Sequence, residues 1–141
     1  MPARTVPGLV RVLLADDHPG VLRAVAELLE ASGAFTVVAA CADGAQAVAA
    51  ARVTAPDIAV LDLAMPVLDG LSTTRALRAE HPGLTVLVLT SASGEHVVEA
   101  ARSAGAAGLV VKGAAPGALP GQLLAVLDGR GTWPAASPVS C

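Results

Sequence analysis

The sequence contains few aromatic residues, a single lysine and no long uncharged stretch. Its 141 residues include one Phe, one Trp and no Tyr, while Ala, Val and Leu dominate the 54% that are hydrophobic. Such small side chains favour close packing of helices on a sheet over a sandwich or barrel rich in large residues. The longest uncharged stretch, Gly113–Leu127, is interrupted by Pro and Gly and is too short to cross a bilayer.

Basic residues and cysteine are also scarce. The chain has 9 Lys and Arg against 12 Asp and Glu, a net charge of -3, and no basic run. We therefore expect no direct contact with nucleic acid and none with a membrane. Cys41 and Cys141 have no disulfide or zinc spacing, and Cys41 is expected to be a small buried hydrophobe. No export signal opens the sequence, so we expect a cytoplasmic protein.

Five short apolar runs alternate with segments of helical spacing. The runs are rich in Val, Leu and Ile without polar alternation, which indicates strands buried on both faces of a parallel sheet. The pattern predicts an α/β domain of the (βα)5 type, a doubly wound five-stranded parallel sheet with the flavodoxin-like order 2-1-3-4-5. The expected strands are Leu9–Ala15, Thr36–Ala40, Ile58–Leu61, Thr85–Leu89 and Gly108–Val111, and the expected helices include Ala45–Arg52, Leu71–Glu80, Glu95–Ser103 and Leu119–Leu127.

The composition also predicts where the domain ends. The domain is expected to span residues 9–129, and residues 130–141, rich in Gly, Pro, Ser and Ala, are expected to form a linker or a disordered tail. Proline within a helix removes a backbone hydrogen bond and clashes with the preceding turn. The last regular helix should therefore begin near Pro120, with Pro116–Leu119 as a separate turn.

Polar side chains follow four of the expected strands. Asp16 and Asp17 follow the first strand, Asp62 the third, Thr90 the fourth, and Lys112, the only lysine, the fifth. Ligands of an open α/β sheet bind at the carboxyl ends of its strands, so these residues should converge. Three adjacent carboxylates repel one another, which a divalent cation such as Mg²⁺ relieves. One carboxylate can then attack phosphorus, while the ammonium and hydroxyl groups neutralise the phosphoryl oxygens.

Together these residues resemble the response-regulator receiver domain of two-component signalling, which has the CheY-like fold. The resemblance covers roughly Val10 to Gly129. Its local sequences are similar to the NarL/FixJ (LuxR-type) subfamily, whose members usually carry a C-terminal helix-turn-helix. The matching segments are Ala15-Asp-Asp-His-Pro19, Asp62-Leu-Ala-Met65-Pro66-Val-Leu-Asp69-Gly70, Thr90-Ser91 and Lys112-Gly-Ala-Ala-Pro116.

This resemblance implies a role for each site residue. Asp62 would be the phosphoacceptor, and Thr90 and Lys112 would contact the phosphoryl group. Mg²⁺ would be the cofactor. Its protein ligands would be Asp17 directly, Asp16 mainly through water, Asp62, and the backbone carbonyl of Ala64.

The resemblance also implies a signalling protein and not a metabolic enzyme. The domain would catalyse only its own phosphorylation, by a sensor histidine kinase, and its dephosphorylation. It would control transcription through a DNA-binding domain absent from this chain. The chain itself would be either a receiver excised from a longer protein or a stand-alone receiver. A homodimer is expected through the face of Glu95–Ser103, Gly108–Val111 and Leu119–Leu127. The alternative face combines Leu119–Leu127 with the first expected helix, whose apolar side carries Val21, Val25, Leu28 and Leu29. The alternative is a degenerate receiver that acts as a phosphorylation-independent interaction module.

Several positions depart from the family pattern. Leu109 stands where the family usually carries Tyr, Phe or His, so an aromatic switch is not expected. Gly113 replaces the proline that often follows the lysine, and a trans peptide is expected there. Ala64 and Ala92 have no polar side chain to engage a hydrolytic water.

Two other fold families fit the sequence less well. A haloacid-dehalogenase-like phosphatase would carry its nucleophile as Asp-x-Asp after the first strand, whereas Asp62 follows the third. A nucleotide-binding Rossmann half-domain would need a Gly-rich phosphate loop after the first strand, and none is present.

The remaining polar residues have ordinary structural interpretations. Asp16 and Asp17 could be N-caps, and Asp69-Gly70 is expected to provide turn and cap chemistry. Met65 is expected to pack in its loop. Surface or capping roles are expected for His18, His81 and His96 because they lack metal-ligand spacing.

Overall fold

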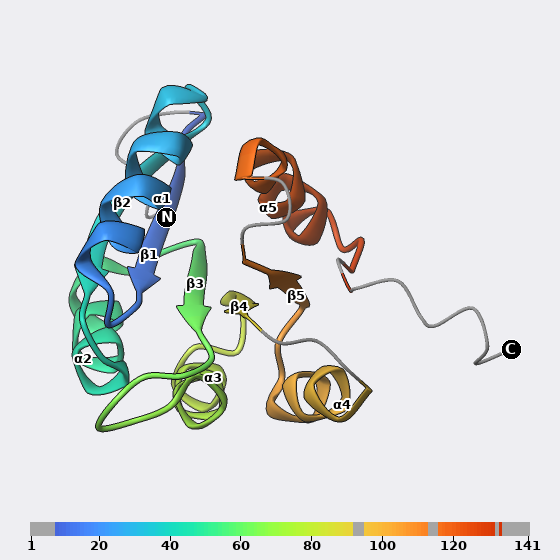
Figure 1. Cartoon of the computed structure of the whole chain (residues 1–141). Coiled ribbons are helices and arrows are strands. Elements are labelled where there is room, and N and C mark those ends of the chain that lie inside the picture. The colour runs from blue at the N-terminus through green and yellow to red at the C-terminus, as the bar shows by residue number, and fades with distance from the viewer. Residues whose placement is uncertain (1–7, 92–94, 113–115, 132, 134–141) are drawn as a thin grey trace, which may run out of the picture.

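A five-stranded parallel sheet forms the centre of the computed structural model, which describes residues 8–91, 95–112, 116–131 and 133 (Figure 1). Neighbouring strands are hydrogen-bonded in the order β2-β1-β3-β4-β5, and every pair is parallel. The predicted (βα)5 fold and strand order are therefore confirmed. The strands are β1 (Val10–Ala15), β2 (Phe35–Cys41), β3 (Ile58–Asp62), β4 (Thr85–Thr90) and β5 (Gly108–Val111).

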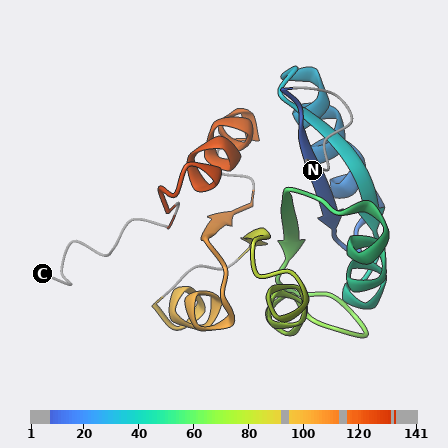
Figure 2. The ribbon, with the colours of Figure 1, turned by 180° about the vertical axis from the view of Figure 1, so that it is seen from behind.

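In the part of the chain that the structure describes, five α-helices cover the two faces of the sheet (Figures 1 and 2). On one face lie α1 (Pro19–Ala31) and α5 (Leu119–Leu127), and on the other lie α2 (Gly44–Thr54), α3 (Gly70–Glu80) and α4 (Glu95–Ala104). Successive strand residues alternate between the two cores: Val12 packs on the side of α1, and Leu13 packs on the side of α2. Two helices on the second face, α2 and α4, contribute fully buried alanines, which lets them approach the sheet closely.

The helix starts follow local sequence signals. The carboxylate of Asp43 accepts a hydrogen bond from the backbone N of Gln46 at 2.8 Å and caps α2. Asp69 caps α3 in the same way, through the backbone N of Ser72 at 2.8 Å, which confirms its predicted cap role. A 3-10 turn at Pro116–Ala118 precedes α5, as the prolines predicted.

The residues around the end of β3 are packed tightly against α3. Gly70, the first residue of α3, donates its backbone N–H to the carbonyl oxygen of Leu63 at 2.9 Å. A Cβ atom on Gly70 would lie 2.8 Å from the Cα atom of Leu63, closer than side chains tolerate. The absence of a side chain at position 70 therefore allows α3 to begin directly beside the last residue of β3.

The segment after α5 returns to α4. The ring of Trp133 is half-buried against the core on the α4 side, and Cζ of Arg102 lies 4.3 Å from the ring centroid. Residues 132 and 134–141, which include Cys141 and most of the predicted tail, lie outside the described residues. Cys41 is buried, as expected. Within the described ranges, no helix combines the length and apolar character needed to span a membrane.

Candidate functional site

The predicted site residues meet at the carboxyl ends of the strands. Asp16 directly follows β1, Asp62 and Thr90 end β3 and β4, and Lys112 directly follows β5. The chain leaves β1 for α1 on one face and leaves β3 for α3 on the other, so these two adjacent strands form the topological switch point, where ligands of such sheets bind. The backbone N of Lys112 donates to the carbonyl oxygen of Thr90 at 2.7 Å, which holds the lysine at this edge.

Lys112 joins two of the carboxylates. Its Nζ atom lies 2.8 Å from Oδ1 of Asp62 and 2.9 Å from Oδ2 of Asp16. The side chains of Asp16 and Asp62 are only 4% and 5% exposed, and that of Lys112 is 22% exposed. Buried carboxylates are stable as ions only when they are paired, so the single ammonium group stabilises both of them.

His18 lies at the same site, which the sequence analysis did not predict. Its Nδ1 atom lies 3.0 Å from Oδ1 of Asp16 and 3.0 Å from Oδ1 of Asp17. The side chain is 65% exposed, so a surface position is correct. His18 also occupies the N-cap position of α1, yet its side chain makes no capping hydrogen bond, and neither aspartate is the cap.

His18 reaches the carboxylates because of the turn that precedes α1. Its backbone N donates to Oδ1 of Asp16 at 2.9 Å, and Pro19 begins the helix immediately afterwards. The only sequence signal for this contact was that His18 directly follows the acidic pair. Of the other histidines, His81 follows α3 as its C-cap and His96 is exposed on α4.

The two buried carboxylates differ in their affinity for protons. Burial raises the pKa of Asp62, and the negative charges of Asp16 and Asp17 raise it further, against the opposing effect of Lys112. Burial also acts to raise the pKa of Asp16. The hydrogen bonds from Lys112 and from the backbone and ring of His18 outweigh that effect, so the pKa of Asp16 lies below its usual value.

The positively charged partners bind their protons more tightly. The hydrogen bond to Asp16 and the charge of Asp17 raise the pKa of His18. Desolvation acts to lower the pKa of Lys112, but its contacts with Asp62 and Asp16 raise it overall. Lys112 is therefore a cation throughout the neutral range.

The acidic residues fit a divalent cation. Donor atoms of Asp16, Asp17, His18 and Asp62 all lie within 4.8 Å of one another. Three of these four residues offer carboxylate oxygens, the ligands that Mg²⁺ prefers. The donor set therefore fits the predicted Mg²⁺. Ala64 is an exposed residue of the loop after β3, and the role of its carbonyl as a ligand stays a prediction.

Leu109, which stands where the family usually carries an aromatic residue or histidine, lies in the core. Leu109 is 1% exposed within the core on the α4 side, and Thr90 is buried at the end of β4. Met65 is also buried in that core, which confirms its packing role. The predictions for Ala92 and for the peptide bond at Gly113 concern residues outside the described ranges.

Comparisons with known proteins agree with this architecture. The family model for the response regulator receiver domain matches residues 12–123. This chain belongs to the response regulator receiver domain family. The match covers most of the domain, including the strand ends that carry Asp16, Asp62, Thr90 and Lys112.

The receiver domain is similar to NarL-type and LuxR-type regulators. It is 36% identical over 121 residues to a nitrate/nitrite response regulator protein homolog of Haemophilus influenzae, covering 86% of this chain and 58% of the relative. The solved receiver domain of NarL from Mycobacterium tuberculosis superposes with a TM-score of 0.83 at 33% identity, covering 88% of this chain and 100% of that one.

A LuxR-family response regulator from Aurantimonas gives a TM-score of 0.84 at 35% identity, covering 93% of this chain and 91% of that chain. The receiver domain spans about half the length of the curated relatives that it matches.

Proposed function

We propose that this receiver domain accepts a phosphoryl group on Asp62 and uses the resulting charge change to alter its interaction surface. One observation carries the proposal. Asp62 is a buried carboxylate whose Oδ1 lies 2.8 Å from the only lysine of the chain, beside two further carboxylates. A nucleophile, a compensating cation and a cluster of metal ligands are the parts that phosphoryl transfer to an aspartate requires.

The reaction follows from these groups. An oxygen of Asp62 forms a bond to phosphorus while the bond from phosphorus to the donor nitrogen or acyl oxygen breaks, and the donor leaves with the electron pair. The ammonium group of Lys112 favours the ionised, nucleophilic form of Asp62 and then pairs with a phosphoryl oxygen. The hydroxyl group of Thr90, at the end of the neighbouring strand, donates a hydrogen bond to another phosphoryl oxygen.

The acidic residues would hold the cofactor. We assign direct ligation to Asp17, Asp62 and the carbonyl group of Ala64, with Asp16 acting mainly through water. Mg²⁺ bound there supplies positive charge that offsets the carboxylates and the incoming phosphoryl group. Asp16 also positions Lys112, because its Oδ2 lies 2.9 Å from Nζ.

The donor would be a sensor histidine kinase in the cytoplasm, and the output would be transcription, through a DNA-binding domain outside residues 9–129. The support is the similarity to NarL-type regulators, which this chain matches over about half their length. In this role the domain is not a metabolic enzyme and catalyses only its own phosphorylation and dephosphorylation.

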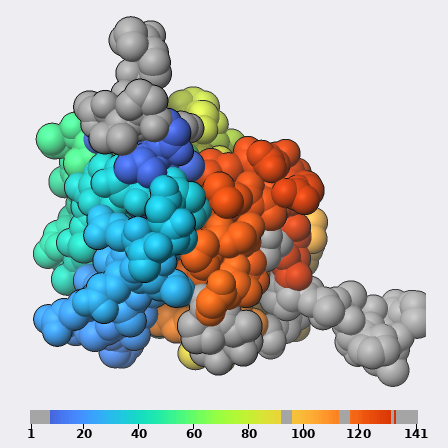
Figure 3. Space-filling model, turned by 90° about the horizontal axis from the view of Figure 1, so that it is seen from above, coloured from blue at the N-terminus to red at the C-terminus, as the bar shows by residue number. Residues whose placement is uncertain are grey.

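Self-association would use a face that includes α5. A groove of about 390 Å³ between α1 and α5 is lined mostly by apolar side chains, with Lys112 and Gln122 as its polar members. The two helices lie side by side in Figure 3, α1 in blue and α5 in orange. Leu124 of α5 is 41% exposed. These features support a homodimer through α1 and α5, or through α4, β5 and α5. Sedimentation of the wild type and of Leu124→Glu, with and without phosphorylation, tests it.

Intact mass after incubation with Mg²⁺ and acetyl phosphate tests the phosphorylation. The wild type should gain the mass of one phosphoryl group, and Asp62→Asn should gain none. Asp69→Asn is the matched control, because Asp69 follows Asp62 in the same loop and Asn caps a helix as well as Asp does. Label on Asp16 or Asp17 would show that the assignment is wrong. No label on the wild type would favour the phosphorylation-independent interaction module.

A further inference from the structure

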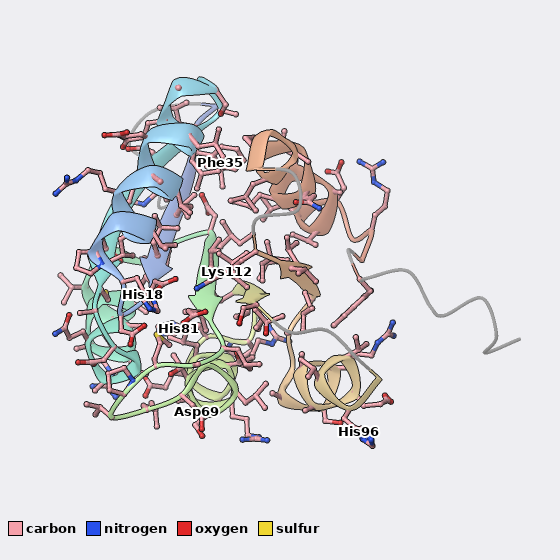
Figure 4. All side chains as sticks on the ribbon, in the orientation of Figure 1. His18, Phe35, Asp69, His81, His96 and Lys112 are labelled. Atoms are coloured by element: carbon pink, nitrogen blue, oxygen red, sulfur yellow. The ribbon has the colours of Figure 1, made fainter. Side chains whose placement is uncertain are left out.

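His18 adds a nitrogen donor to a site that otherwise offers carboxylate oxygens. Its Nδ1 atom lies 3.0 Å from one oxygen of Asp16 and 3.0 Å from one oxygen of Asp17. These atoms and an oxygen of Asp62 lie within 4.8 Å of one another, which is close enough for a single ion to contact all four residues. In Figure 4, His18 and Lys112 lie near the ends of β1 and β3, whereas His96 lies on α4, away from both.

The charge of the cluster independently favours a cation. Three carboxylates meet there, and the side chains of two of them, Asp16 and Asp62, are almost fully buried. Lys112 supplies one positive charge to these two, and Asp17 has only the ring of His18 near it among the contacts described. A divalent ion close to Asp17 would therefore find a carboxylate that Lys112 does not contact among the ion pairs described, and an imidazole nitrogen.

Imidazole changes which divalent ion such a site prefers. Mg²⁺ takes oxygen ligands and keeps several waters, so a nearby nitrogen adds little to its binding. Co²⁺, Ni²⁺ and Zn²⁺ bind imidazole well, and their affinity for mixed nitrogen and oxygen sites exceeds that of the earlier first-row ions. A histidine next to two aspartates therefore favours these later transition metals over Mg²⁺.

We propose that His18 is a ligand for late first-row transition-metal ions at this site, through Nδ1, together with Asp17 and Asp62. The bound ion replaces the hydrogen on Nδ1 that the ring shares with Asp16 and Asp17, and this proton is released to solvent. The consequence is that Co²⁺, Ni²⁺ or Zn²⁺ competes with Mg²⁺ for the acidic cluster. His18 raises the affinity for these ions relative to that for Mg²⁺. This inference rests on the proposed function, because it assigns a second class of ion to the same site.

The test compares two histidines that differ in position. A tag-free protein with Cys141→Ser, which removes a competing thiol ligand, is the parent. His18→Phe keeps an aromatic ring at the site and removes both nitrogens, and His96→Phe makes the same change on α4. Calorimetry at one fixed pH gives the affinity of each protein for Co²⁺ and for Mg²⁺. Proton NMR of the Co²⁺-loaded proteins shows whether imidazole ring signals are shifted strongly by the paramagnetic ion.

We expect the parent to bind Co²⁺ more tightly than Mg²⁺. His18→Phe should lower the Co²⁺ affinity about tenfold, with a much smaller change for Mg²⁺. It should also remove the shifted imidazole signals, which His96→Phe should retain. The inference is overturned if the parent shows no shifted signals, or if His18→Phe changes both affinities equally.

The same data separate this inference from the proposed function. A parent that binds Mg²⁺ and is phosphorylated on Asp62, yet places Co²⁺ away from His18, refutes the inference alone. A parent that binds no divalent ion refutes both.

Discussion

The backbone of Gly70 lies against the carbonyl group of Asp62 with no room for a side chain between them. The two residues belong to different elements, since Asp62 ends β3 and Gly70 begins α3. The loop that carries Ala64 and Met65 closes between them. This contact ties the position of Asp62, the proposed phosphoacceptor, to the start of a helix.

Gly70→Ala should therefore disturb both stability and the site. The added Cβ atom meets the backbone of Asp62 and Leu63, which cannot move aside as a flexible side chain would. We expect the free energy of unfolding to fall by about 2 kcal/mol, within the usual range for overpacking. Mg²⁺ affinity should fall as well, because the carboxylate of Asp62 is displaced. Urea unfolding and calorimetry measure the two effects.

Gly121→Ala provides the control for that experiment. Gly121 lies in α5, and a Cβ atom there meets nothing within 4 Å. This change should raise the free energy of unfolding by about 0.5–1 kcal/mol, because Ala is a better helix former than Gly. A loss of stability as large as that of Gly70→Ala would contradict the explanation by close contact.

Asp62→Asn should make the protein more stable at neutral pH in the absence of divalent ions. Because the pKa of Asp62 is raised in the folded state, ionisation of this carboxyl group lowers stability as the pH rises above the unfolded value of 3.8, and the full cost is reached above the folded value. The neutral amide removes this cost, which amounts to about 1.4 kcal/mol for each unit by which folding raises the pKa. The gain should shrink as the pH falls through the raised pKa and Asp62 itself becomes protonated.

Urea unfolding at a series of pH values measures the difference in unfolding free energy between Asp62→Asn and the wild type. Asp16→Asn should behave in the opposite way, because the pKa of Asp16 is lowered in the folded state. The stabilising contribution of the ionised Asp16 is present above the unfolded value of 3.8 and is lost as the pH falls through the folded value. Equal behaviour of the two variants would show that the two environments have been assigned wrongly.

Lys112→Met should separate metal binding from the response to phosphorylation. The substitution keeps the length of the side chain and removes the ammonium group that contacts Asp16 and Asp62. Mg²⁺ affinity should be retained or increased, since a competing positive charge is lost. The NMR shifts produced by beryllofluoride, a phosphoryl mimic, should fall sharply. Arg130→Met removes a positive charge from an exposed pair outside the site and should change neither measurement.

Leu109 should remain packed in both states of the domain. Its side chain is 1% exposed within the core and has no polar tip that solvent could stabilise. We expect only small changes in its methyl NMR signals when beryllofluoride is added. A large rotamer change, coupled to shifts across β5 and α5, would contradict this prediction.

Truncating the side chain of Leu109 measures how much its packing contributes to stability. Leu109→Ala should cost about 2–5 kcal/mol of unfolding free energy. The same truncation at the partly exposed Leu124 should cost much less.

The fold could be predicted because its signals are local and repeated. Each apolar run forms a strand whose ends differ from the prediction by at most one residue: Phe35 and Cys41 belong to β2, and Asp62 ends β3. The convergence of Asp62 with Lys112 also followed from the sequence, because parallel strands end at one edge of a sheet. Composition alone does not predict that Asp62 and Lys112 meet. The prediction came from the parallel sheet, which places the ends of β3 and β5 at the same edge.

Two contacts could not be predicted, and both depend on where one side chain points. His18 has no second histidine or cysteine at metal-ligand spacing, so only the turn before α1 shows that its ring meets Asp16 and Asp17. Trp133 lies in a stretch rich in Gly, Pro and Ser, whose composition predicted a tail. Its contact with Arg102 joins residues that are distant in the sequence, and no periodic pattern reports such a pair.

The stacking of Trp133 on Arg102 gives the protein an intrinsic optical probe. The chain contains no other tryptophan and no tyrosine, so its near-ultraviolet fluorescence comes almost entirely from this one ring. The ring connects the segment after α5 with α4, and its emission depends on whether the guanidinium group or water surrounds it. Any rearrangement that separates this segment from α4 would therefore change the emission maximum and the intensity of Trp133 fluorescence, so no added fluorescent label is needed.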